Sequence, residues 1–207
     1  FSPYRQASDL LDVYLAVSHD GQLWARPQRT PIIPLPERYG GLYPTPELVE
    51  LDEDTWAVMT MGCRHAHNFL AASPEGTLRR MMKHPSEFVW ATWKRDRLVA
   101  IEADDYAEFT MSELECAGEQ LKLNFRTHQS GAHIKVEIVD GGIPNRSTAA
   151  LPPALAGFSF DDCDALAGDE LDGVVTWDGK SDLSDLKGKQ IHLRFHMVRA
   201  RLFAVTL

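Results

Sequence analysis

The segment IHLRFHM at residues 191–197 decides the fold class, because apolar and polar residues alternate along it without interruption. Successive side chains of a β-strand point to opposite faces of a sheet, so this pattern predicts a strand with one packed and one solvated face. Residues 121–126 and 134–138 repeat the pattern, and turn-forming pairs such as Asp140-Gly141 separate such segments. The second half of the chain is therefore predicted to be a β-sandwich with Greek-key or jelly-roll connections.

The first half is also predicted to be β, but with a different rhythm. A tight hairpin turn at Asp20-Gly21 follows the predicted strand at residues 12–17, and three more predicted strands cover residues 48–51, 55–61 and 68–72. Short strands in meander order are typical of a propeller blade. We therefore predict an all-β chain: a partial β-propeller, about one blade plus an outer strand pair, over residues 1–85, and a jelly-roll β-sandwich over residues 86–207.

Composition and charge limit the possible partners. The 207 residues carry 21 basic and 30 acidic side chains, a net charge of −9, which argues against nucleic acid as a partner because phosphate neutralisation requires basic residues. The longest stretch without a charged residue, 147–160, contains two prolines and is too short to span a membrane, so no membrane partner is expected. Because the first residue is Phe, we expect either that a leader was removed or that the chain is part of something longer.

Several segments resemble a known family. Residues 15–21 (LAVSHDG), Trp24, Arg26-Pro27 and residues 31–35 (PIIPL) resemble the late blades of five-bladed propeller glycoside hydrolases, family 32-like and family 43-like. Residues 157–163, 168–171, 174–177, 181–184 and 186–189 resemble the C-terminal β-sandwich that follows that propeller. The resemblance implies the C-terminal part of a glycoside hydrolase, which acts on a carbohydrate and is completed by N-terminal blades or by another chain. The alternative is a non-catalytic module for carbohydrate binding or protein interaction.

Catalytic residues are not assigned. Family 32 enzymes use acids within Trp-Met-Asn-Asp-Pro and Arg-Asp-Pro motifs, and neither motif occurs here. The third family acid belongs to a Glu-Cys pair, which Glu115-Cys116 matches, but this pair falls after the last predicted blade. A glycosidase needs two facing carboxyl groups, and one blade does not supply both. We therefore expect the 207 residues alone to be inactive.

The candidate sugar-binding residues lie at the ends of blade strands. The first strand of a blade lines the propeller channel, which places Tyr43 and Glu47 toward a sugar, with Glu47 as the one acid positioned for general-acid work. The segment CRHAH at residues 63–67 adds Arg64, His65 and His67 at the rim. The alternative is that each of these side chains lies at a strand end, exposed to solvent, and has no role in binding.

Two segments contain residues that could bind a metal ion, but neither has the spacing of a known site, so we predict no metal site and no cofactor. Cys63, His65 and His67 share one face of an extended segment, as zinc ligands do, but no fourth ligand has suitable spacing. The acidic residues within 161–172 suit either Ca²⁺ or the capping of turns, and they lack the spacing of a Ca²⁺ loop. His192, Arg194 and His196 are predicted to form a solvated sheet face. The tryptophans within strand patterns are predicted to be core residues.

Overall fold

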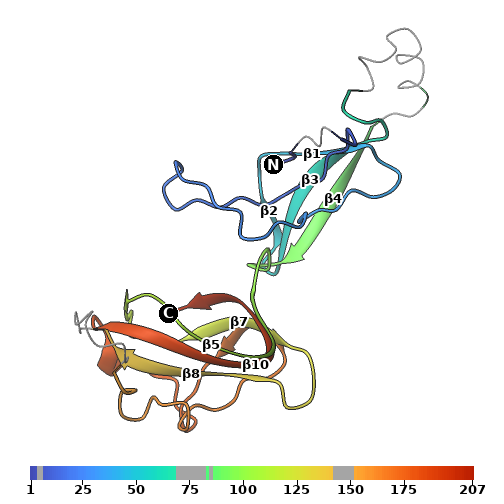
Figure 1. The fold of residues 1–207 in the computed structure, drawn as a ribbon. Coiled ribbons are helices and arrows are strands. Elements are labelled where there is room, and N and C mark those ends of the chain that lie inside the picture. Colours follow the sequence, from blue (N-terminus) through green and yellow to red (C-terminus); the bar gives the residue numbers. More distant parts are fainter. Residues whose placement is uncertain (4–6, 69–82, 84–85, 142–151) are drawn as a thin grey trace. The chain divides into compact units, whose positions relative to one another are not determined.

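The computed structural model describes residues 1–3, 7–68, 83, 86–141 and 152–207, and the chain forms two compact units, residues 1–98 and 99–207 (Figure 1). Each unit contains one antiparallel sheet, which confirms the all-β prediction. The boundary falls after Leu98 rather than after residue 85, because the strand at residues 87–94 belongs to the first sheet. Part of one predicted strand, residues 69–72, lies outside the described residues.

The first sheet is built around β3 (Thr55–Cys63), which pairs along one edge with β4 (Glu87–Lys94). Its other edge pairs first with β1 (Gly41–Pro44) and then with β2 (Val49–Asp52). β1 and β2 therefore act as one strand that is interrupted at residues 45–48. Pro44 and Pro46 explain the interruption, because proline has no N–H to donate to a neighbouring strand.

One face of the first sheet is covered by the N-terminal segment of the chain. Val13, Tyr39 and Leu42 are buried there, with partly buried Ile32, Ile33, Leu35 and Val89 packed against them. The Tyr39 ring lies directly on the backbone of Gly62, where an added Cβ would approach the ring to 2.6 Å. Glycine at position 62 is what allows the ring to lie so close.

The opposite face of the first sheet is apolar and exposed. Direct pairing places Phe88 beside Met61 and Trp90 beside Met59. The side chain of Phe88 is 69% exposed and that of Trp90 is 53% exposed. The prediction that strand tryptophans are core residues is therefore wrong for Trp90, whereas it is confirmed for Trp177, which is 2% exposed. A strand pattern alone does not show which face of a sheet is covered.

The second sheet is organised around one long strand, β10 (Gln190–Thr206). The other strands of this sheet are β5 (Ile101–Thr110), β6 (Leu114–Glu115), β7 (Lys122–Thr127), β8 (His133–Asp140) and β9 (Asp169–Val174). A short 3-10 helix, η1 (Ser184–Leu186), precedes β10. Along β10, residues 191–198 pair with β8, residues 200–206 pair with β7, and residues 194–202 pair with β5 on the other edge. One strand therefore joins every other strand of the unit except β9, which pairs with β7.

A bulge at Arg199 keeps apolar side chains of β10 on the core side both before and after it. Arg199 has a φ of 46°, and the register with β5 shifts between Val198 and Ala200. Buried residues occupy odd positions up to Met197 and then the even positions Ala200 and Leu202. A second register shift, between Leu202 and Ala204, places Val205 against the core. One extra residue moves the following side chains to the other face of a strand, so the bulge returns the apolar positions to the core.

The core of the second unit matches the predicted strand phases. Phe125, Val136, Leu193 and Phe195 are each at most 1% exposed. The rings of Phe195 and Phe109 stack with centroids 4.9 Å apart. Within the described ranges, no helix is long and apolar enough to cross a membrane.

Candidate functional site

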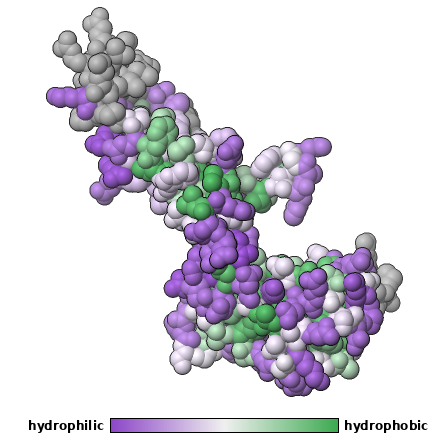
Figure 2. All heavy atoms as spheres, turned by 180° about the vertical axis from the view of Figure 1, so that it is seen from behind, coloured by the Kyte–Doolittle hydropathy of each residue, from purple (hydrophilic) through white to green (hydrophobic). Residues whose placement is uncertain are grey.

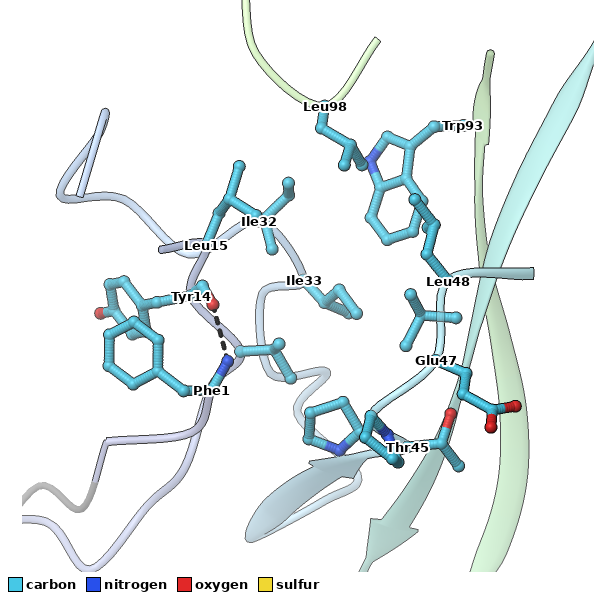
Figure 3. Close-up of a pocket in the computed structure, with 14 residues that line it drawn as sticks. Phe1, Tyr14, Leu15, Ile32, Ile33, Thr45, Glu47, Leu48, Trp93 and Leu98 are labelled. Carbon is cyan, nitrogen blue, oxygen red and sulfur yellow. Dashed lines mark hydrogen bonds between the residues drawn. The ribbon is translucent and has the colours of Figure 1, made fainter. Parts of the chain in front are cut away.

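A pocket of about 430 Å³ opens on the covered face of the first sheet (Figure 3). The interruption between β1 and β2 forms one wall, with Pro44, Thr45, Pro46, Glu47 and Leu48. Apolar side chains complete the lining, among them those that Figure 3 labels as Tyr14, Leu15, Ile32, Ile33, Trp93 and Leu98. The pocket is therefore largely hydrophobic.

Glu47 is the single acidic residue among those that line the pocket. Figure 3 shows its carboxylate directed away from Ile33 and Tyr14. Glycoside hydrolysis requires a pair of carboxyl groups, about 5–5.5 Å apart in retaining enzymes and about 6.5–9.5 Å apart in inverting ones. The pocket lining does not contain such a pair.

Tyr43, which precedes pocket residue Pro44 in β1, is brought together with His67. The Tyr43 hydroxyl and His67 Nδ1 are hydrogen-bonded at 3.1 Å. The backbone N–H of His67 donates to the Asp9 carbonyl at 3.0 Å, which ties the 64–68 loop to the N-terminal segment. Burial raises the pKa of Tyr43, so its hydroxyl stays protonated and able to donate.

Arg64 lies in a network around Glu87. A guanidinium nitrogen of Arg64 approaches Glu87 Oε1 at 2.5 Å, and the Tyr39 hydroxyl donates to Oε2 at 2.9 Å. These hydrogen bonds, with the nearby Arg38 charge, hold the pKa of Glu87 below its usual value. Glu87 is therefore a carboxylate that orients Arg64, not a proton donor. Nothing in the local sequence links Glu87 to Arg64, because the pairing of β3 with β4 brings them together.

Four of the five predicted site residues lie at one end of β3, and Glu47 does not. Tyr43 faces Met61, and residues 64–67 follow the end of β3, where Gly40 packs against the His65 backbone. Thr45, close to Glu47, donates its N–H to the Met59 carbonyl. Met59 is four residues before Cys63, where β3 ends, a separation of roughly 13 Å along a strand. We define Tyr43, Arg64, His65 and His67, together with Glu87, as the polar rim. Strand pairing places Tyr43 on the face of Met61 and Glu87 on the face of Gly62, so the rim spans both faces of the sheet.

In the described part of the chain, neither residues 63–67 nor the acidic segment 161–172 forms a set of metal ligands. Among the described residues, no group of three or more His, Cys, Asp or Glu side chains is arranged to hold a metal ion. In the acidic segment, Asp164 accepts hydrogen bonds from Thr176 Oγ1 and the Gly179 N–H, and Asp162 accepts two from Ser159. These carboxylates therefore cap turns, and the hydrogen bonds lower the pKa of both.

Comparison with known proteins assigns the chain to no family. No family model matches it, and no curated protein or solved structure is significantly similar to it. Glu115, which matches two letters of a family motif, lies on β6 in the second unit, where it pairs with Gln190. The interpretation of the site therefore depends on the residues of this chain and their geometry.

Proposed function

We propose that this chain is the C-terminal portion of a propeller glycoside hydrolase. In this proposal the first unit is a propeller blade that contributes one rim of a carbohydrate site, and the second unit is a stabilising jelly-roll sandwich. The observation that carries the proposal is the uncovered apolar face of β3 and β4. A propeller blade is packed on both faces by its neighbours, whereas the described part of this chain forms a core on one face of the sheet and leaves Phe88 and Trp90 exposed on the other.

The exposed face is large enough to matter energetically. A fully exposed aromatic side chain has a surface of about 150–250 Å². Because Phe88 is 69% exposed and Trp90 is 53% exposed, the two side chains together leave about 250 Å² in contact with water. At about 25 cal/mol per Å², covering that area contributes roughly 6 kcal/mol. A neighbouring sheet that covered this face would supply such a gain, which supports a partner formed by further blades or by another chain.

The polar rim is suited to hydroxyl groups. Tyr43 and His67 offer a phenol and an imidazole, and Arg64 offers guanidinium donors that Glu87 already holds in place. Groups that are held in position before binding lose less conformational entropy when a ligand arrives. The rim has no pair of carboxyl groups free for acid and base roles, which supports sugar contact without hydrolysis by this chain alone.

A sugar titration of the ¹⁵N-labelled chain tests the proposal. We expect amide shifts at residues 41–43 and 64–67, with a millimolar Kd that corresponds to about −4 kcal/mol, because in this proposal the first unit supplies one rim of the site. Tyr43→Phe removes one hydroxyl and should weaken binding, whereas Glu53→Gln, an exposed turn residue, is the matched control. An absence of shifts at the rim with every sugar tried would reject the proposal.

The alternative, a non-catalytic interaction module, is equally compatible with the exposed apolar face, so the response of the rim to sugars distinguishes the two. Such a module would bind a protein partner through Phe88 and Trp90 without any response of the rim to sugars. Turnover of aryl glycosides by the chain, lost on Glu47→Gln, would contradict both proposals and make Glu47 catalytic.

A further inference from the structure

The outer face of the second sheet carries a cluster of aromatic and charged side chains. Strand pairing places His196 between Glu108 on β5 and Lys135 on β8, and it places Arg194 beside Glu137. These positions have the opposite phase to buried Phe195, so they face away from the core. We call the following set the His196 cluster: Tyr106, Glu108, His133, Lys135, Glu137, Phe160, Arg194 and His196.

Hydrogen bonding fixes which imidazole nitrogen carries the proton in the neutral rings. His196 Nδ1 lies 3.2 Å from Glu108 Oε1, and His133 Nδ1 lies 3.0 Å from the Gly131 carbonyl oxygen. A carboxylate and a carbonyl can only accept, so Nδ1 is the donor in both rings. Nε2 of each neutral imidazole then carries the lone pair and acts as an acceptor.

Aromatic rings surround these acceptors. The rings of His133 and His196 stack with centroids 5.5 Å apart, and Phe160 contacts His196 edge-on at 5.7 Å. Tyr106 lies 5.1 Å from His196, also edge-on, and is 58% exposed. The cluster therefore offers an accessible apolar ring directly beside hydrogen-bond acceptors.

The charges of the cluster balance, which argues against an ionic ligand. Glu108 and Glu137 supply two negative charges, and Lys135 and Arg194 supply two positive ones. Lys135 Nζ donates to the Phe160 carbonyl at 2.8 Å, and Arg194 Nε lies 2.5 Å from Glu137 Oε1. The cations are thus already engaged, and a phosphate or carboxylate ligand would meet no surplus positive charge.

We propose that the His196 cluster is a second carbohydrate-binding site, separate from the rim of the first unit and specific for neutral sugars. A neutral pyranose presents hydroxyl donors to His133 Nε2, His196 Nε2 and the Glu108 carboxylate. Its C–H face packs on the Tyr106 ring, because aromatic faces attract apolar surface that carries partial positive charge. Glu108 is a positioning residue as well, since it orients the His196 ring.

The test uses the full 207-residue chain, ¹⁵N-labelled and titrated with xylotriose, cellotriose and maltotriose to about 50 mM, well above a millimolar Kd. We expect at least one sugar to shift the amides of residues 106–108, 133–135 and 194–196. Tyr106→Ala should weaken this binding about tenfold, whereas Tyr106→Phe, which keeps the ring, should retain most of it. Arg126→Ala, an exposed β7 residue outside the cluster, is the matched control.

The two proposed sites are read out separately in the same spectra. Shifts at residues 41–43 and 64–67 report the rim of the first unit, and they should be the same in Tyr106→Ala as in the parent chain. The inference is overturned if no sugar shifts the cluster amides. It is also overturned if the shifts persist unchanged in Tyr106→Ala while the spectrum shows an intact fold.

Discussion

Replacing Phe195 by alanine is expected to destabilise the second unit by about 3–5 kcal/mol, the range for a buried aromatic side chain. The ring is fully buried, and direct pairing places it between Phe109 on β5 and Val136 on β8. It also stacks on Phe109 at 4.9 Å, and such aromatic pairs contribute about 0.5–1.5 kcal/mol beyond burial. The cost should therefore lie toward the upper end of the range.

Amide hydrogen exchange measures this cost for the second unit alone. The slowest amides of β8 and β10 report global opening, and a loss of 3–5 kcal/mol should accelerate their exchange roughly 10² to 10⁴-fold. If Phe195→Ala does not fold, Phe195→Leu, which keeps most of the apolar volume, should show a smaller loss in the same direction.

His196→Ala is the matched control, because His196 is the next residue on the same strand and faces the other way. Its contacts, a partly exposed pair with Glu108 and ring contacts with Tyr106 and His133, should contribute less than about 1 kcal/mol to stability. If His196→Ala cost more than Phe195→Ala, the register of β10 given above would be wrong by one residue.

Three further predictions concern the first unit. Gly62→Ala should destabilise this unit by about 1–3 kcal/mol, because the new Cβ would meet the Tyr39 ring at 2.6 Å. Amide hydrogen exchange should become faster in β1 and β3 and stay unchanged in β8. The pKa of Glu87 is lowered by Arg64 and Tyr39, so its stabilising effect is present above the ordinary value of 4.5 and is lost as the pH falls below it. Unfolding of the first unit between pH 5 and about 2 should therefore depend less on pH in Glu87→Gln than in the parent chain. Replacing both Phe88 and Trp90 by serine should change stability by no more than about 0.5 kcal/mol per site while reducing the binding of a hydrophobic dye. A large stability loss there would show that the face is covered within the chain.

Part of the fold and little of the candidate site could be predicted from the sequence. The phases of residues 121–126, 134–138 and 191–197 predicted the buried apolar residues correctly, because strand alternation is a local property with period two. The predicted solvated phase was wrong for Asn124 and Glu137, which are 3% and 7% exposed. The rim residues Tyr43 and His67 were predicted individually, and their hydrogen bond was not. Glu87 was missed because it lies 23 residues after Arg64 and meets it only through the pairing of β3 with β4.

The sequence by itself determined the all-β class and the apolar phases of the main strands, since both follow from neighbouring residues. Tertiary structure alone decided that residues 191–197 and 202–206 form one strand, joined by the bulge at Arg199. It also decided that Trp90 is exposed while Trp177 is buried, and that Glu108 orients His196. These features depend on which strands become neighbours, and pairing energies between distant segments are not encoded in the pattern of any one segment.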